Sequence, residues 1–315
     1  MRPFLIAGLL LAAAAPALAN DTTAQLAAGG LELTRTDAIE MRSEDLFISR
    51  KAVRVRYVFA NTSGRDVTVR VAFPMPVLEG EVLNYQDVSV PQPDSDNFLG
   101  FATEVDGKRV QAELEQRAFA GGREQTAWLR AHHVPIAPHL AATEAAIARL
   151  TPAERAEGQR LKLLSEDDAA IWSMRATYHW MQTFPAGRPI TVEHRYTPSV
   201  GGTVATGLGT PYGAETVQRY CADASLIAAV RRARQTREEP FTEQWVHYVL
   251  TTGANWKKPI GSFRLVIDKE NPRDLVSFCG DGVRKLDATR FEMRKANWRP
   301  TRDLAILFLV PTDAQ

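Results

Sequence analysis

Apolar and polar residues alternate in two neighbouring stretches near the start of the chain, residues 53–59 and 67–73. An alternation of period two is typical of strands that bury one face. The segment between them, residues 61–66, is rich in turn-forming residues, and Pro74 and Pro76 end the second stretch because proline cannot donate to a strand ladder. We therefore predict an antiparallel hairpin here.

A second hairpin is specified more closely, because Asp106-Gly107 is a two-residue turn signal. Pairing Val105 with Lys108 places Thr103 opposite Val110, so that both strands bury the same face. The turn and the apolar pattern therefore predict the same register.

From residue 122 to about residue 165 the pattern becomes helical. Thr151, Pro152 and Glu154 supply an N-cap, a first-turn proline and the acid of a capping box. The run just upstream, residues 139–150, is rich in alanine, which is a strong helix former. We predict two or three helices inserted between strand segments.

Strands resume after the helical segment. The alternating stretches 172–180 and 190–196 flank Pro185-Ala186-Gly187, which fits a three-residue hairpin loop. With that loop, the register places Tyr178 beside His194. Further along we predict a helix over residues 215–234 and strands around 246, 263–267, 275–278 and 304–310.

These elements indicate an α+β fold, predominantly antiparallel β with sandwich-like sheets, a helical insertion and one further helix. The predicted organisation is a signal peptide over 1–19, an N-terminal β segment over 20–121, a helical insertion over 122–170 and a C-terminal β segment over 171–315 with its helix near 215–234. The alternative is one integrated domain over 20–315.

The first 19 residues have the three-part layout of a secretory signal peptide. Arg2 precedes an apolar run, residues 4–15, and the small-residue triplet 17–19 follows. The run is too short for a membrane anchor, which takes about 20 apolar residues. We expect cleavage after Ala19 and a soluble periplasmic protein, without a lipid anchor because the next residue is Asn and not Cys.

Charge and composition exclude two broad classes of protein. The chain of 315 residues has 38 Lys and Arg, 37 Asp and Glu, and 45% hydrophobic residues. Loss of the signal peptide removes Arg2 and no acid, which leaves the mature chain without net charge. A disordered chain is excluded by the hydrophobic content, and a strongly basic nucleic-acid-binding protein by the charge balance.

Export changes the meaning of the two cysteines, Cys221 and Cys279. An even number of cysteines in an oxidising compartment favours a disulfide over a metal site or a nucleophile. Neither belongs to a C-x-x-C pair, so dithiol redox chemistry lacks a second partner nearby. We predict that the two form a structural disulfide.

Familiar motifs for catalysis, metals and cofactors are missing from the sequence. There is no G-x-S-x-G elbow and no H-E-x-x-H helix, and the glycine spacing in residues 207–213 fits neither nucleotide-binding motif. The histidines at 132, 133 and 139 lack further ligands at zinc spacing, and residues 94–97 lack the later positions of a calcium loop. We therefore expect no catalytic residue to be recognisable, no metal and no cofactor.

Aromatic and histidine side chains are the candidates for contact with a ligand or partner. We select Tyr178, Trp180, His194 and Trp256, because exposed aromatic rings can stack on sugars or anchor a protein partner. The competing interpretation is that these rings belong to the core, since aromatic residues are also strand formers. The sequence favours the core for the tryptophans and leaves the contact role open.

Several motifs resemble the domain of unknown function family 4424, a group of exported, uncharacterised bacterial proteins. They are Gly-Gly-Leu-Glu-Leu-Thr at 29–34, Val-Arg-Val-Ala-Phe-Pro-Met-Pro at 69–76, Trp-Met-Gln-Thr-Phe-Pro at 180–185, His-Arg-Tyr-Thr-Pro-Ser-Val-Gly at 194–201, Thr-Gly-Ala-Asn-Trp-Lys-Lys-Pro-Ile-Gly at 252–261 and Val-Ser-Phe-Cys at 276–279. The resemblance covers nearly all of the mature chain, and the last two motifs are the most specific. It implies a bacterial periplasmic protein and brings no catalytic residue to assign.

The sequence therefore favours a binding role over an enzymatic one. The expected partner is an envelope protein or a glycan, bound at an edge strand or a tryptophan-bearing groove. Nucleic acid and a transmembrane segment are not expected. The alternative is a cell-envelope hydrolase acting on glycan or peptide, which predicts a pocket where at least two of His179, His194, Glu193 and Asp168 converge beside Trp or Tyr.

Overall fold

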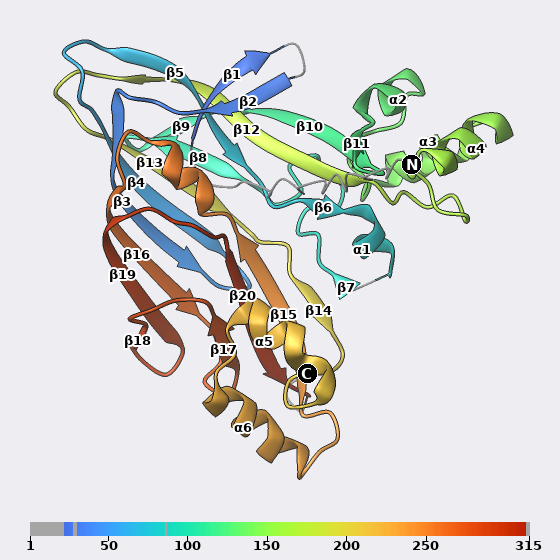
Figure 1. Ribbon diagram of the computed structural model, residues 1–315. Helices are drawn as coiled ribbons and strands as arrows, with labels where there is room; N and C mark the ends of the chain where they lie inside the picture. Colours follow the sequence, from blue (N-terminus) through green and yellow to red (C-terminus); the bar gives the residue numbers. More distant parts are fainter. Residues whose placement is uncertain (1–21, 28–29, 86, 313–315) are drawn as a thin grey trace, which may run out of the picture.

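The computed structural model describes residues 22–27, 30–85 and 87–312. Antiparallel sheets dominate it and short helices lie at both ends of the molecule, which confirms the predicted α+β fold class (Figure 1). The predicted signal peptide lies outside the described residues. Among the helices that are described, none is long and apolar enough to cross a membrane.

Three sheets form the framework. The upper sheet has the order β11 (Arg123–Glu124), β10 (Glu113–Ala120), β12 (Ser173–Phe184), β5 (Val67–Pro74), β1 (Thr22–Ala27) and β2 (Gly30–Thr34), and β6 (Leu78–Glu79) pairs with the start of β12. The long sheet has the order β18 (Arg284–Lys285), β19 (Arg290–Trp298), β16 (Ile260–Asp268), β3 (Ile39–Ile48), β4 (Val53–Asn61), β13 (Ile190–Tyr196), β8 (Ala102–Val105) and β9 (Lys108–Val110). The lower sheet has the order β17 (Leu275–Phe278), β20 (Leu304–Pro311), β15 (Phe241–Tyr248), β14 (Gly201–Thr203) and β7 (Asp87–Val88).

The long sheet runs down one side of the molecule (Figure 1). The upper sheet lies across its upper end, and the lower sheet faces its lower end. The main core fills the space that the three sheets enclose and includes Tyr57, Phe73, Tyr248 and Phe263. Each of these rings is at most 1% exposed. The sheets are therefore joined by one continuous apolar interior.

Two of the three predicted hairpins are wrong. β4 lies in the long sheet and β5 in the upper sheet, and β12 and β13 are divided between the same two sheets. Both connections are arches that carry the chain from one layer to the other. The ring of Phe59 on β4 meets that of Phe184 on β12 across the layers, with 5.9 Å between centroids. An arch buries the alternating apolar residues of both strands as completely as a hairpin would.

The two arches brace each other. The side-chain amide of Asn61 donates to the carbonyl oxygens of Arg65 and Phe184, at 2.8 and 2.7 Å. The backbone amide of Ala186 donates to Asp66 at 2.9 Å. Polar turn residues that predicted a hairpin therefore hold the crossing instead.

The hairpin at Asp106-Gly107 is confirmed in its register. Val105 pairs with Lys108, and Thr103 pairs with Val110. Both turn residues have positive φ, 48° at Asp106 and 73° at Gly107, as the tight two-residue turn requires.

The helical insertion is also confirmed, with three helices, α2 (Thr126–Ala131), α3 (Ala141–Ala148) and α4 (Pro152–Arg160). The capping box at Thr151 and Glu154 is complete, because each side chain bonds the other's backbone amide. These helices cover the far ends of β10 and β12 with a second apolar cluster, which includes Leu129, Ile147 and Trp172.

The predicted helix over 215–234 is divided in two, α5 (Ala214–Tyr220) and α6 (Ala224–Arg234). Cys221 takes a left-handed conformation, with φ of 53°, and ends α5. Asp223 then caps α6 by accepting a hydrogen bond from the amide of Leu226 at 2.8 Å. Together with the lower sheet, the two helices enclose a third apolar cluster. The remaining helices are short: α1 (Gly80–Tyr85), η1 (Pro211–Gly213) and η2 (Thr251–Asn255).

Candidate functional site: a central cleft

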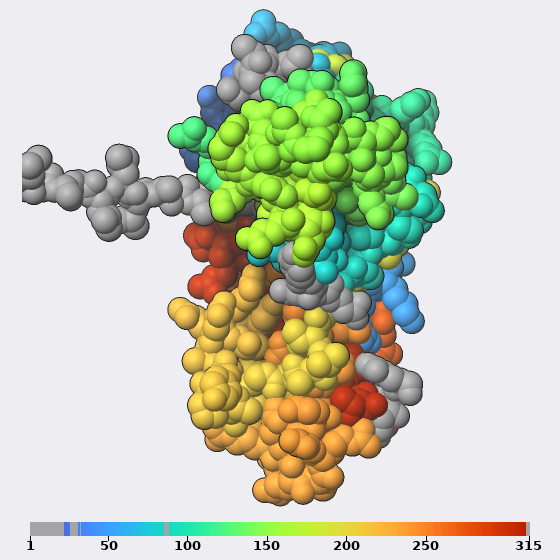
Figure 2. Space-filling view, turned by 90° about the vertical axis from the view of Figure 1, so that its right-hand side faces the viewer, coloured from blue at the N-terminus to red at the C-terminus, as the bar shows by residue number. Residues whose placement is uncertain are grey.

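A cleft of about 1820 Å³ separates the upper part of the molecule from the lower part. In the space-filling view, a waist lies between the green helical insertion and the yellow and orange segments below it (Figure 2). The lining residues come from α1, β6, the ends of β10 and β12, the segment after β13, α5, β15 and β20. We call this cavity the central cleft, with an upper wall from β6, α1, β10 and β12 and a lower wall from α5, β14, β15 and β20.

Side chains of β15 point alternately to its two faces, and those on one face form part of the lower wall. Val246 and Tyr248 point into the main core, whereas Glu243, Trp245 and His247 lie on the opposite face and line the cleft. Trp245 also packs against the third apolar cluster, so this face of β15 joins the packing under α5 and α6 to the wall of the cleft.

Trp245 depends on a glycine in the neighbouring strand. Gly201 pairs with Trp245 in the sheet, and a Cβ atom at position 201 would lie 2.3 Å from the indole Nε1. Only a residue without a side chain leaves room for the indole in this position.

His247 lies beside the aromatic ring of Tyr220 and the positive charge of Arg219. Its ring stacks against that of Tyr220, with centroids 6.5 Å apart and planes inclined by 13°. Burial lowers the pKa of His247 to about 4, and the positive charge of Arg219 acts in the same direction. His247 is therefore a neutral imidazole at neutral pH, and its Nε2 atom is buried without a hydrogen-bond partner.

The upper wall is built around β12. Arg175 holds its guanidinium over the ring of Phe119, 4.1 Å from the centroid. Ser173, two residues before it on the same face, donates to the carboxylate of Glu79 on β6. Lys162, which follows α4, lies against this end of the cleft.

Three of the five carboxylates in the cleft are engaged in internal hydrogen bonds. Glu79 accepts from Ser173, and Glu243 accepts from the Thr206 hydroxyl at 2.6 Å. Asp303 accepts from the backbone amides of Leu250 and Thr251, both at 3.1 Å, and so caps η2. The other two, Glu81 and Glu215, are exposed.

The three cations of the cleft are arranged differently. Lys162, Arg175 and Arg219 are exposed, and none of them forms an ion pair with a carboxylate in the part of the chain that the structure describes. Two of them are held over aromatic rings, Arg175 over Phe119 and Arg219 at 5.9 Å from the Tyr220 centroid. Their N–H groups are thus positioned and still free to bind a ligand.

The floor of the cleft is aromatic and apolar. Tyr196 at the end of β13 and Tyr248 at the end of β15 line it. The Tyr248 hydroxyl lies 3.0 Å from that of Tyr57 in the core. Burial raises the pKa of Tyr196, so its hydroxyl stays protonated.

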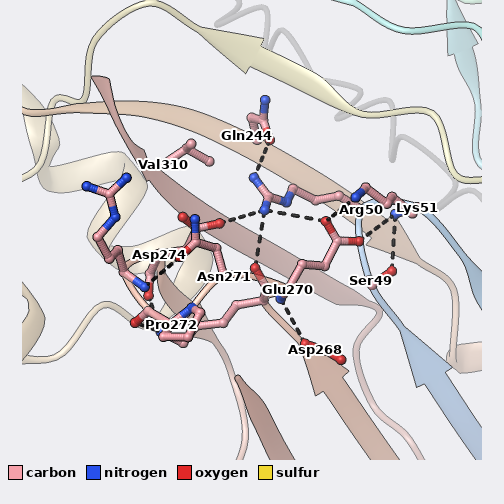
Figure 3. A network of polar contacts seen from close by, with 12 residues as sticks. Ser49, Arg50, Lys51, Gln244, Asp268, Glu270, Asn271, Pro272, Asp274 and Val310 are labelled. Atoms are coloured by element: carbon pink, nitrogen blue, oxygen red, sulfur yellow. Dashed lines mark hydrogen bonds and ion pairs between the residues drawn. The ribbon is translucent and has the colours of Figure 1, made fainter. Parts of the chain in front are cut away.

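A smaller cavity of about 520 Å³ lies on the other side of β14, and Gly201 lines both cavities. Beside it, Arg50 from the turn after β3 donates to Gln244 on β15 at 2.8 Å and to Asp274 at 2.5 Å (Figure 3). Lys269 donates to the carbonyl oxygens of Pro272 and Asp274. Burial raises the pKa of Asp274, and the nearby Arg50 opposes that shift. This Arg50 network joins the long sheet to β15 and holds the lower wall in place.

The predicted disulfide is present. Cys221, directly after α5, is bonded to Cys279, directly after β17, and the bridge spans 58 positions of sequence. It anchors the end of the helix that carries Arg219 and Tyr220 to the lower sheet. The disulfide therefore stabilises one wall of the cleft.

The structure places all four selected contact residues in the core. Tyr178 is 5% exposed, Trp180 3%, His194 2% and Trp256 2%. Their rings pack against other core residues; the ring centroids of Trp256 and Phe59, for example, are 4.5 Å apart. They leave little surface for a ligand in this conformation, so a contact role for them stays an untested prediction.

The residues of the hydrolase alternative point in different directions. His179 bonds Arg70 on the outer face of the upper sheet, and Glu193 bonds Arg56 on the outer face of the long sheet. His194 lies within the core, and Asp168 accepts from Gln159 beside α4. The pocket that this version required is not formed by these four residues.

The other histidines serve local structure. His132 stacks on Trp128, with centroids 4.0 Å apart, and His139 lies 3.1 Å from the carbonyl oxygen of Ser95. Within the described residues, no group of three or more His, Cys, Asp or Glu side chains could hold a metal ion.

The residues that line the cleft were missed in the sequence. A usable signal existed on β15, where Glu243, Trp245 and His247 alternate with apolar residues and so share a face. Arg175 alternates with apolar residues in the same way. Arg219 lies on a short helix and carries no comparable signal.

We compared the chain with a set of curated proteins, with solved structures and with protein-family models. None of the curated proteins matches the sequence. A crystal structure from Legionella pneumophila, described as a putative nutrient binding protein, is 17% identical and has a TM-score of 0.47, over 93% of this chain and 71% of that one. An M1 zinc metallopeptidase from Deinococcus radiodurans is 10% identical with a TM-score of 0.28, and this chain, 87% covered, matches 43% of its length. The family described as a domain of unknown function (DUF4424) matches residues 19–307, and the chain belongs to this family.

Proposed function

We propose that this chain is an exported, non-catalytic binding protein that holds its ligand in the central cleft. The observation that carries the proposal is the cleft itself, about 1820 Å³ in volume and lined by aromatic rings and by cations that lack ion-pair partners among the described residues. Protein interiors are close-packed, so a hollow of this size beside a continuous core is a surface available for binding.

The carboxylates in the cleft support a binding role over a catalytic one, because most of them already accept hydrogen bonds within the protein. General acid–base catalysis needs a titratable group within hydrogen-bond reach of the substrate, and a second group to orient it. Glu79, Glu243 and Asp303 already accept hydrogen bonds from the fold. His247 is neutral, and its stacking partner Tyr220 is not an acid that could orient it as a base.

The periplasmic address is part of the proposal. It rests on the sequence pattern of residues 1–19, and the disulfide between Cys221 and Cys279 is compatible with an oxidising compartment.

A substitution that fills the central cleft with a large side chain tests the proposal. Thr216 on α5 lines the cleft, whereas Gln218 on the same helix is exposed and does not. We would measure the melting temperature of the mature chain with a panel of probes: an unfolded protein, chitin oligosaccharides, free amino acids and simple sugars. A ligand at 100 times its Kd stabilises by about 2.7 kcal/mol, which corresponds to a shift of roughly 5 °C.

We expect at least one probe to give this shift with the wild type and with Gln218→Trp, and to lose it with Thr216→Trp. If no probe stabilises the wild type, or if Thr216→Trp responds as the wild type does, binding in the central cleft is wrong.

A further inference from the structure

The size and the charges of the central cleft indicate what kind of ligand it fits. Pockets for small molecules are typically about 300–1,000 Å³. The central cleft, at about 1820 Å³, exceeds that range and runs between two walls contributed by segments far apart in the sequence. Its dimensions therefore suit a chain-like ligand better than a single small nutrient.

Each wall carries charges of both signs. The upper wall has Lys162 and Arg175 together with Glu79 and Glu81, and the lower wall has Arg219 together with the carboxylates Glu215, Glu243 and Asp303. A polyanion would meet carboxylates on both walls, and a polycation would meet guanidinium or ammonium groups on both. A neutral glycan would leave the cations without ionic partners. A polypeptide carries both signs of charge and can match them.

The uncharged part of the lining also fits a polypeptide. Between the charged groups lie the partly exposed side chains of Val82, Leu83, Phe119 and Trp245, which offer apolar surface for side chains such as leucine or valine. Aromatic residues combined with arginine are the usual composition of surfaces that bind polypeptides.

The loop between β14 and α5 adds an exposed apolar surface. Val204 is 86% exposed and Tyr212 is 91% exposed, and both ends of this loop, at Thr203 and Glu215, line the cleft. Gly207 and Gly213 close the base of the loop, because a Cβ at 213 would lie 2.4 Å from the Gly207 carbonyl oxygen. These two side chains add apolar area beside the cleft that a bound segment can cover.

Building on the proposed function, we propose that the ligand of the central cleft is an extended polypeptide segment of another protein. Arg175 and Arg219 bind its acidic side chains, and the exposed carboxylates of Glu81 and Glu215 bind its basic ones. Its apolar side chains lie on the partly exposed apolar residues between the walls. Val204 and Tyr212 contact the segment where it leaves the cleft.

The probe for this proposal is reduced and carboxamidomethylated α-lactalbumin, an unfolded chain with both signs of charge, labelled for fluorescence anisotropy. We expect saturable binding to the wild type. Arg175→Glu with Arg219→Glu, and separately Val204→Ser with Tyr212→Ser, should each weaken it at least tenfold. Met181→Ser is the matched control, because Met181 is 56% exposed on β12 and does not line the cleft.

Circular dichroism and melting curves of each variant separate loss of binding from loss of folding. If the unfolded protein does not bind and a chitin oligosaccharide does, with that binding lost in Thr216→Trp, the cleft binds ligands and the polypeptide proposal is overturned. If the unfolded protein binds equally well to wild type and to both double variants, the contacts assigned here are wrong.

Discussion

Gly201 lies directly beneath the indole of Trp245, so that a Cβ atom at position 201 would come within 2.3 Å of Nε1 and 2.6 Å of Cε2. The two residues face each other in neighbouring strands of the lower sheet. The wall of the central cleft is thus fixed by the absence of a side chain on β14 as much as by the aromatic ring on β15.

Gly201→Ala should displace the indole and destabilise the fold by about 1–3 kcal/mol, the usual cost of overpacking. Ligand affinity should fall as well, and the tryptophan emission should shift. Urea unfolding and emission spectra measure these effects. Gly64→Ala is the control, because nothing lies within 4 Å of a Cβ at that exposed turn position. Equal stability and equal affinity in the two variants would contradict the role given to Gly201.

Arg50 is the only cation with a hydrogen bond to the Asp274 side chain in the described part of the chain, and that carboxylate is 1% exposed. Arg50→Met leaves it buried without its charged partner, so we expect a loss of about 3–5 kcal/mol in the free energy of unfolding. Lys51→Met should change this free energy by under about 1 kcal/mol, because Lys51 is 84% exposed and lies 3.9 Å from Glu270. Denaturant titration compares the two.

The double variant Arg50→Met with Asp274→Leu then separates the two causes. If the loss comes from the buried unpaired carboxylate, the double variant should recover part of it. A double variant no more stable than Arg50→Met would mean that the loss comes from the hydrogen bonds of Arg50 to Gln244 and to the carbonyl oxygen of Lys269 instead.

The disulfide closes a loop that spans 58 positions. In the loop-entropy relation, a bridge of this length contributes about 4 kcal/mol by restricting the unfolded chain. We expect Cys221→Ser with Cys279→Ser to lower the free energy of unfolding by about that amount, measured in urea at neutral pH. Wild-type protein unfolded with reductant present should match the variant, whereas the variant itself should not respond to reductant. A wild-type midpoint that is insensitive to reductant would contradict the contribution assigned to the bridge.

Local features of the fold could be predicted from the sequence where one short segment determines the outcome. The Asp106-Gly107 turn and the Thr151 capping box are of this kind, because each is decided by backbone geometry over a few residues. The disulfide could be predicted from the even number of cysteines together with the expected export. The arches at residues 61–66 and 185–189 were not, since alternation shows which face of a strand is buried and not which strand it pairs with.

The site was harder to predict for the same reason. Tyr178 and His194 have the aromatic character of ligand contacts, and the fold uses both of them for the core. Trp245 and Arg175 line the cleft because β15 and the start of β12 lie on opposite sides of it. Which face of a strand meets solvent depends on the neighbouring sheet, and that relationship is formed by residues far apart in the sequence.

His247 gives the pH dependence that we expect of this fold. Its pKa is about 4 in the folded chain and 6.5 in the unfolded chain, because burial and the charge of Arg219 disfavour the protonated ring. The unfolded chain therefore binds the proton first as pH falls. Stability is fully present above pH 6.5 and is lost between pH 6.5 and 4, by about 2 kcal/mol for this partly exposed ring.

His247→Gln should remove most of this slope, since glutamine does not titrate and keeps polar atoms at the position. His133→Asn is the matched control, because His133 is exposed and asparagine tolerates its positive φ of 54°. Urea unfolding at intervals between pH 4 and 7 measures the slope for each protein. If the wild type and His247→Gln lose stability in parallel over this window, other groups are responsible, and His247 is not held neutral by Arg219 and by its place in the cleft wall.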